Sequence, residues 1–501
     1  MSDEHSDLIG GRRLARSTAW NLLGTAAPLL VAVVAIPLLV EGMGVARFGV
    51  LTLVWAGVGY FSLFDLGLGR ALTKLVAEHL GAGRDDEIPA LFWTATTLMV
   101  VIGILGAAII AGSTPWLVGG LLKIPGNLQP EAINAFYLLA VSIPIVTSTA
   151  GFRGFLEANQ RFDLVNAVRV PLGMFTFLGP LAVLLISQNL ALMVVALVLA
   201  RVLACAAHVA LCLCVTPALR TAASVRRMVV GPLLNLGGWM TVTNIVGPLM
   251  TYLDRFIVGA LVSMAAVAHY ATPYDVIANL GFIPGAVMGV LFPAFAASFV
   301  ADRSRAAAVY DSGVKYTLVV LFPITLVVVT LAQPGLGLWL GQEFADKSFR
   351  IFQLLAIGRF INGLAQLPFG LVQGVGRPDL TAKLHLAELP LYMAGVWFMV
   401  GTYGIEGAAI AWVMRSAIDA LLLFVMAQQF VPLTTHAIRQ VVTGVAGALL
   451  LIAGGTLSMS SSAKTFFLVT VLSVFLVHAW RCFLKDAHKM LLLSSIRRHK
   501  A

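Results

Sequence analysis

Charged residues are scarce in this sequence. Asp, Glu, Lys and Arg make up only 11% of the 501 residues, against about 25% in soluble globular domains. Hydrophobic residues account for 59%. Such a composition excludes an ordinary soluble protein and an intrinsically disordered one, because both need many more charges on their surface. It predicts an all-α protein that crosses the membrane many times.

Residues that mark catalytic or metal centres are also few. The four cysteines match no metal-site spacing. The sequence has no phosphate-cradling glycine loop, no nucleotide-sugar motif and no nucleophile triad. The longest predicted outer loop, at 111–132, holds one glutamate and one lysine. We therefore expect no enzyme activity, no cofactor and no metal.

Long apolar runs follow one another along the whole chain. A helix needs about 20 apolar residues to cross roughly 30 Å of hydrocarbon. Fourteen runs meet this length, and we predict fourteen transmembrane helices at 18–40, 48–70, 88–110, 133–153, 164–186, 190–214, 231–252, 267–293, 314–336, 349–372, 383–402, 405–428, 439–457 and 465–484.

Basic residues indicate the orientation of these helices. With the N-terminus inside, and with residues near the ends of spans assigned to the adjoining segment, 23 of the 33 Lys and Arg residues are cytoplasmic, six are on the outer side and four lie inside spans. This asymmetry follows the positive-inside rule and predicts that both termini are cytoplasmic. The net charge of +10 is thus explained by topology, and nucleic acid is not an expected partner.

One motif occurs twice. The pattern G-x-x-[E/Q]-x-x-x-R-x-D-L spans residues 154–164 and again 370–380, a displacement of 216 residues. Six predicted helices separate the two copies, so both lie on the cytoplasmic face, and the duplication is parallel. We expect these loops to brace each half of the protein rather than to bind cargo.

The duplication defines the domain organisation. Two pseudo-symmetric six-helix bundles are followed by two extra helices that have no counterpart. The predicted parts are a basic N-terminal tail (1–17), an N-lobe (18–215), a linker (216–230), a C-lobe (231–430), two further spans (431–484) and a basic tail (485–501) expected on the inner leaflet.

Several short motifs resemble one family. The segments Trp20–Gly24, Arg47–Gly49, Tyr60–Leu72, Tyr252–Ile257 and Gly404–Ala409 are similar, in order and spacing, to bacterial polysaccharide-unit flippases. These belong to the polysaccharide transporter branch of the multidrug/oligosaccharidyl-lipid/polysaccharide exporter superfamily. The resemblance covers essentially the whole chain.

The resemblance implies a function. Such a protein moves an oligosaccharide repeat unit on a polyprenyl diphosphate carrier from the cytoplasmic to the outer leaflet, by alternating access of two lobes. It implies the bacterial inner membrane, a role in lipopolysaccharide or exopolysaccharide synthesis, and a polymerase and export machinery as partners.

Four arginines lie within predicted spans. A charge at the bilayer centre costs roughly 2.5–3.5 kcal/mol on insertion scales, so buried charges face a cavity or each other. Arginine's planar fork suits phosphate oxygens. We predict that Arg359, Arg201, Arg415 and Arg169 line a cationic cavity for the head group. The alternatives are that Asp419, four residues along, neutralises Arg415, and that Arg169 extends to the membrane surface.

Three acids at membrane depth are candidates for ion coupling. Asp65, Asp275 and Glu388 could each bind a proton or sodium ion. The alternative for Asp65 is an ion pair with Arg70, and for Glu388 one with a facing arginine or His385. His385 is the repeat equivalent of Arg169.

Two other functions share some of these features. A multidrug or cation antiporter of the sister branch has the same architecture, but cationic cargo favours an acidic cavity, and the first span contains no acid. A membrane polysaccharide polymerase or ligase needs a sizeable outer loop, which is missing from the predicted topology.

Overall fold

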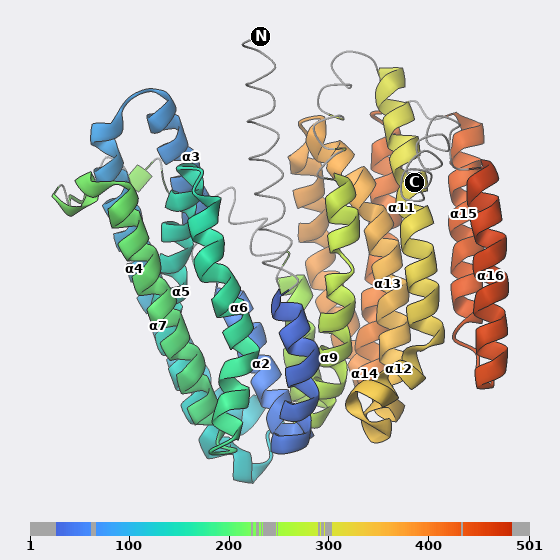
Figure 1. Ribbon diagram of the computed structural model, residues 1–501, viewed down its shortest axis with the longest axis horizontal. Helices are drawn as coiled ribbons and strands as arrows, with labels where there is room; N and C mark the ends of the chain where they lie inside the picture. The colour runs from blue at the N-terminus through green and yellow to red at the C-terminus, as the bar shows by residue number, and fades with distance from the viewer. Residues whose placement is uncertain are drawn as a thin grey trace, which may run out of the picture. The chain divides into compact units, whose positions relative to one another are not determined.

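The structure is a computed structural model. It describes residues 27–61, 67–221, 224–226, 249–288, 303–431 and 434–482, with six further residues between them. Nearly all of these residues are helical and none forms a strand (Figure 1). Lipid offers no hydrogen-bond partners to an open backbone, so a chain this apolar must bond its peptide groups within helices. The all-α membrane class is confirmed.

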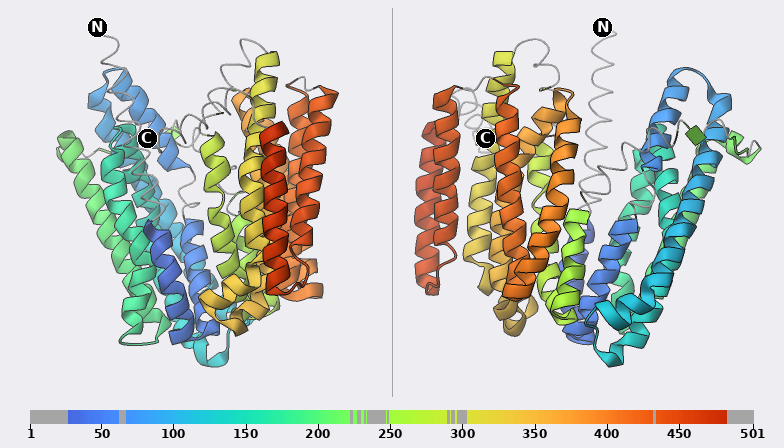
Figure 2. Two further views of the ribbon diagram at one scale, coloured as in Figure 1. Left: turned by 45° about the vertical axis from the view of Figure 1, so that its right-hand side comes forward. Right: turned by 180° about the vertical axis from the view of Figure 1, so that it is seen from behind.

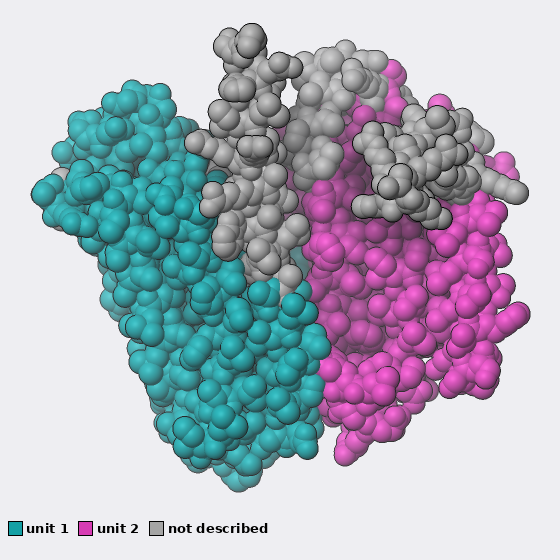
Figure 3. Space-filling model, in the orientation of Figure 1, with its two compact units in different colours: residues 1–268 teal, residues 269–501 magenta. Residues whose placement is uncertain are grey.

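The chain divides into two compact units, residues 1–268 and 269–501 (Figure 3). The division falls inside α9, Met264–Asn279, and not in the predicted linker at 216–230. Contacts within unit 1 explain this: the backbone N–H of Lys123 donates to the Gly259 carbonyl at 2.9 Å, and its Nζ donates to the Leu261 carbonyl at 2.6 Å. The predicted lobe bounds, 18–215 and 231–430, stay a prediction.

Unit 1 is built from apolar helices around a buried aromatic cluster. Phe92, Phe152 and Phe155 are almost fully buried, with Phe92 within 5.0–5.6 Å of the other two ring centroids. The helices are Ala27–Met43, α2 Val45–Phe61, α3 Leu68–Gly81, α4 Ile88–Trp116, α5 Gln129–Ala158, α6 Phe162–Leu184 and α7 Leu190–Val215. The predicted outer loop at 111–132 is partly helical, since α4 continues into a π-turn over Leu117–Leu121.

An ion pair joins three helices at one end of unit 1. Arg47, near the start of α2, donates two hydrogen bonds to Glu131 at 3.1 and 3.0 Å. Glu131 also accepts the backbone N–H of Leu190, the first residue of α7, at 2.9 Å. A bidentate arginine with a carboxylate that caps a helix is among the stronger polar contacts in proteins. Arg47 is therefore a structural residue of unit 1.

Unit 2 ends in the two helices without a repeat counterpart. Both α15, Thr435–Gly454, and α16, Ser461–Cys482, pack against α11, Arg303–Thr330 (Figure 2). The other elements are α12 Ala332–Leu340, α13 Gln342–Gly374 and α14 Pro378–Gln428. At the end of α15 nearer Thr435, Lys315 bridges Asp311 at 2.8 Å and Gln440 at 3.0 Å.

The helix α14 is a hairpin of two antiparallel arms. Gly404 has φ +59° and ψ −140°, far from helical values. Past this point the chain folds back, so that a Cβ on Gly407 would lie 2.0 Å from the carbonyl oxygen of Met399. Only glycine adopts such a conformation readily. The bend falls between the predicted spans 383–402 and 405–428.

The repeated motif forms the same turn twice. Each copy closes a long helix with the two backbone hydrogen bonds of a Schellman motif. In the first copy, the N–H of Arg161 donates to the Leu156 carbonyl and the N–H of Gln160 to the Glu157 carbonyl. In the second, the N–H of Arg377 donates to the Val372 carbonyl and the N–H of Gly376 to the Gln373 carbonyl. Arg161 then binds Asp163 through two hydrogen bonds of 3.0 Å, and Arg377 binds Asp379 at 2.9 and 3.1 Å. The hydrogen bond to the neighbouring carboxylate raises the pKa of both arginines. Both copies therefore share the same turn and the same local ion pair, and the brace role stays a prediction.

Helix boundaries repeat as well. When 216 is added to its residue numbers, α4 begins and ends within three residues of α11, and α5 within three residues of α13. In the same way, α6 matches the first arm of α14 and α7 matches the second. The π-turn after α4 corresponds to α12. The count of fourteen spans stays a prediction, because the first, second, seventh, eighth and fourteenth fall partly outside the described residues.

The two repeated turns differ at one position, and this difference predicts that exchanging glutamine and glycine there has opposite effects on stability. Gln160 has φ +55°, and is the one non-glycine with positive φ among the described residues; its counterpart Gly376 has φ +83°. A side chain in this region costs roughly 1–2 kcal/mol. We expect Gln160→Gly to stabilise the protein by about 1 kcal/mol and Gly376→Gln to destabilise it similarly. Thermal unfolding of the purified protein measures both, and shifts of the same sign would contradict this account.

Candidate functional site

Arg359 lies near the middle of α13 and bonds only neutral groups among the described residues. Its Nη1 donates to the side-chain oxygen of Asn362 at 3.0 Å, and its Nη2 donates to the carbonyl of Ala278 at 3.0 Å. No carboxylate lies within ion-pair distance in the described part of the chain. No described acid therefore compensates its charge, as a cargo-binding cation requires.

The carbonyl that Arg359 binds marks a break in a span. α9 ends at Asn279, and the helix resumes over residues 282–288. The guanidinium fills the space over Gly281, where a Cβ would lie 1.3 Å from Nη2. Broken membrane helices need side chains that satisfy the freed carbonyls. Arg359 does this while keeping its positive charge beside the break.

Arg201 is the corresponding buried cation of unit 1. It lies near the middle of α7 and is 9% exposed; its Nη1 donates to the Leu197 carbonyl of its own helix at 2.9 Å. No carboxylate of the described residues pairs with it. Arg169, on α6, is exposed, and no described side chain pairs with it. These two cations therefore differ: Arg201 is enclosed by unit 1, and Arg169 is open to its surroundings.

Arg415 faces an acid across the α14 hairpin. Its Nη1 lies 3.9 Å from Glu388 Oε2, and its guanidinium lies over the Tyr392 ring at 5.3 Å. Asp419 lies 3.5 Å from the Nε2 of His385 on the opposite arm. The facing partner of Glu388 is thus an arginine, and Arg415 is a compensated charge, unlike Arg359.

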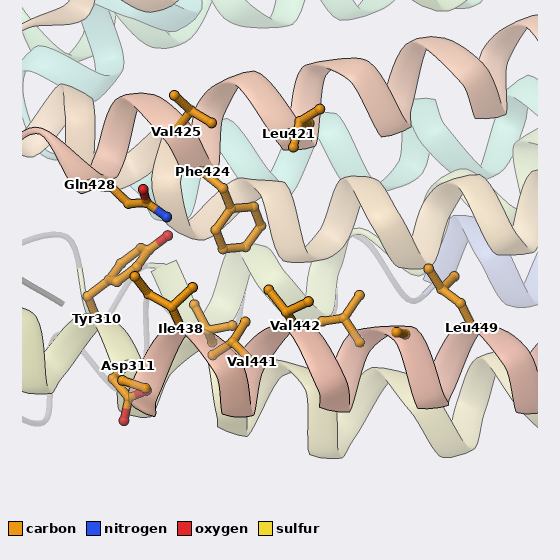
Figure 4. Close-up of a pocket in the computed structure, with 14 residues that line it drawn as sticks. Tyr310, Asp311, Leu421, Phe424, Val425, Gln428, Ile438, Val441, Val442 and Leu449 are labelled. Carbon is orange, nitrogen blue, oxygen red and sulfur yellow. The ribbon is translucent and has the colours of Figure 1, made fainter. Parts of the chain in front are cut away.

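Two pockets lie along this hairpin. One of about 140 Å³ is bordered by Glu388 and Arg415 among apolar side chains of the two arms. The second, of about 360 Å³, lies between α11, α14 and α15. In Figure 4, Tyr310 and Gln428 lie together at one end of it, and apolar side chains follow toward Leu449. Its lining suits a hydrocarbon chain rather than a charged head group.

The remaining acid candidates are unequal. Asp65 lies outside the described residues. Asp275 is partly buried on α9, and its backbone carbonyl accepts a hydrogen bond from the Asn279 side chain at 2.6 Å. Glu388 is buried within the hairpin. The Glu388 carboxylate faces a charged side chain, the Arg415 guanidinium at 3.9 Å.

Sequence reasoning missed a buried charged pair. Asp254 and Arg255 fall in the outer loop predicted between the spans 231–252 and 267–293, yet they are 0% and 1% exposed. The Arg255 guanidinium lies 5.4 Å from the centre of the Tyr252 ring. The segment Tyr252–Ile257, one of the family-like motifs, contained a signal for this burial. An aromatic ring three residues before an arginine can cover the charge of its guanidinium.

The comparisons with known proteins fit this architecture. Residues 43–349 match the family model described as polysaccharide biosynthesis protein. A Shigella flexneri protein named for O-antigen transport is 34% identical over 420 residues, which cover 82% of this chain and 96% of that protein. The chain belongs to the polysaccharide flippase family. It is a multi-pass membrane protein of polysaccharide biosynthesis, and its relatives are named as transporters, not enzymes.

Solved structures share the fold of this flippase family member. The lipid II flippase MurJ, in an inward closed conformation, aligns with a TM-score of 0.71 over 94% of this chain and all of that chain, at 12% identity. An inward-facing multidrug transporter of the MATE family aligns with a TM-score of 0.69 over 81% of this chain and 97% of that chain, at 14% identity. At these identities the likeness establishes the superfamily fold alone.

Proposed function

We propose that this protein moves an oligosaccharide repeat unit, linked to a polyprenyl diphosphate, from the cytoplasmic to the outer leaflet of the bacterial inner membrane. The cargo passes by alternating access through a cationic cavity between two lobes, and both termini are cytoplasmic. The 34% identity to a protein named for O-antigen transport supports the cargo class. A polymerase and the export machinery receive the product.

The single observation that carries the cargo chemistry is Arg359. A guanidinium in a membrane-spanning helix, held by a carbonyl and an amide and by no described carboxylate, keeps a net charge in a region where charge is costly. A diphosphate offers the compensation that no described residue supplies, and an arginine can bind it with two hydrogen bonds.

The other cations contribute unequally to the proposed cavity. Arg201 supplies a second charge, from unit 1, that no described acid compensates, and Arg169 supplies an exposed one nearer the helix end. Arg415 contributes only when its pair with Glu388 opens. We therefore rank Arg359 and Arg201 above Arg169 and Arg415 as contacts of the diphosphate.

Deleting the gene tests the proposed cargo. We expect lipid-linked repeat units to accumulate on the inner leaflet and surface polysaccharide to disappear, with both restored by the wild-type gene. The competing reading is a multidrug antiporter of the sister branch. Drug hypersensitivity without accumulated lipid-linked glycan would favour that reading and refute the proposal.

A further inference from the structure

Four ionisable side chains meet inside the α14 hairpin: His385 and Glu388 from the first arm, Arg415 and Asp419 from the second. One potential ligand atom each from His385, Glu388 and Asp419 lie within 4.8 Å of one another. Glu388 is 6% exposed and Asp419 is 4% exposed. We call these four residues the hairpin cluster.

The carboxylates of the hairpin cluster are not satisfied. Neither Glu388 oxygen accepts a hydrogen bond from any described residue, and the same holds for Asp419 Oδ1. Arg415, at 3.9 Å, is within ion-pair distance of Glu388 but too far for a hydrogen bond. A buried carboxylate without hydrogen bonds is strongly disfavoured while it remains ionised.

The hairpin cluster is not part of the duplicated scaffold. At the positions 216 residues earlier, in α6 and α7, Glu388 is replaced by Leu172, Arg415 by Leu199 and Asp419 by Leu203. The fourth member, His385, corresponds to Arg169, so the same antiparallel pair of helices carries leucine in the other half in place of the two carboxylates and of Arg415. Since folding of the hairpin does not require these charges, their presence calls for another explanation.

The charges facing the hairpin cluster are few. The electrostatic partners of Glu388 are Asp419, Arg415 and His385. From α13, the side chains packed against this part of the hairpin are apolar: Ile361, Ala365 and Phe369, whose ring stacks on His385 at 5.7 Å between centroids. Arg359 on the same helix is bonded to Asn362 and to Ala278.

Counting charges shows what the hairpin cluster lacks. Two carboxylates and one guanidinium leave a net charge of −1 when His385 is neutral. One added proton brings the sum to zero, whereas a divalent ion would leave it at +1. Two neighbouring carboxyl groups in a buried site share a proton because they cannot both remain ionised at low cost.

We propose that the hairpin cluster binds one proton, held by the Glu388 and Asp419 carboxyl groups beside His385. The proton is taken from water and adds to a carboxylate oxygen. Once Glu388 is protonated, its ion pair with Arg415, which joins the two arms, weakens. The link between this bound proton and transport rests on the proposed flippase function. The binding of the proton does not rest on it.

Proton counting tests this proposal. Purified full-length protein is titrated between about pH 8 and pH 5, and proton uptake per molecule is measured. We expect Glu388→Gln to take up about one proton fewer than wild type, because the remaining charges then balance. His385→Gln is expected to match wild type, because the carboxyl groups still require the proton. Asp163→Asn, an exposed acid, is the control and leaves this step unchanged.

Each outcome of the titration decides the question. Uptake that is lost in His385→Gln and kept in Glu388→Gln would mean ordinary histidine titration and overturn the proposal. Uptake abolished by sodium at constant ionic strength would assign the site to sodium instead, and also overturn it. The triple variant Glu388→Leu/Arg415→Leu/Asp419→Leu, which carries the residues found at the corresponding positions of the first half, should fold and lose the step. These measurements need no cargo, so they stand or fall independently of the gene deletion.

Discussion

Replacing Arg359 with Gln is expected to lower glycan export by roughly 10- to 100-fold at equal membrane levels. A hydrogen bond to a charged group contributes about 1.5–3 kcal/mol, and each 1.4 kcal/mol is about tenfold in rate. Arg359→Lys keeps the charge and should retain part of the activity, without the planar fork. Arg153→Gln, which removes an exposed cation paired with Glu157, is the matched control.

A second substitution separates cargo binding from the structural bond to Ala278. Gly281→Ala would place a Cβ 2.5 Å from Arg359 Cζ, so the guanidinium must leave the helix break while its charge remains. If Arg359 binds cargo, Arg359→Gln loses export at unchanged melting temperature. If both variants lose stability and export in proportion, Arg359 is only a brace. Wild-type export by Arg359→Gln would remove this residue from the cavity.

The second large effect is expected within the α14 hairpin. Glu388→Leu removes the carboxylate that faces the partly buried Arg415, and breaking a buried ion pair by removing one partner costs up to about 3–5 kcal/mol. Exchanging both residues for leucine, as at the equivalent positions Leu172 and Leu199, should cost little, because an apolar pair of similar size is often neutral or stabilising.

Thermal unfolding of the two single variants and the double variant measures this coupling. We expect the double variant to melt within a few degrees of wild type and well above either single variant. Additive losses, with the double variant least stable, would mean that the two side chains do not compensate each other. Such additivity would also weaken the charge count on which the proton site depends.

Much of the fold was predictable because lipid restricts the choices of the chain. Apolar runs gave α4, α6 and α7 with starting residues no more than two positions from those observed. The duplicated motif predicted two identical joints, and the arginine–aspartate pairs at 161–163 and 377–379 have the same geometry. Local sequence suffices here because turns and spans depend on neighbouring residues.

The site was less predictable because it depends on how helices rotate against each other. Asp419 is one turn from Arg415, and helical spacing suggested that they pair; the structure instead places Asp419 beside His385 and Glu388 opposite Arg415. The helix break that Arg359 caps was also not expected, since the apolar run at 267–293 continues through it. Contacts across helices decide both features.

Reconstitution tests the central claim most directly. The purified protein is placed in liposomes carrying a polyprenyl-diphosphate-linked oligosaccharide, and a membrane-impermeant glycosidase reports which leaflet the glycan occupies. We predict that wild-type protein exposes glycan from the inner leaflet to the enzyme, that Arg359→Gln does so far more slowly, and that Arg153→Gln matches wild type. Equal exposure in liposomes with and without the protein would contradict the assignment of flipping to this chain.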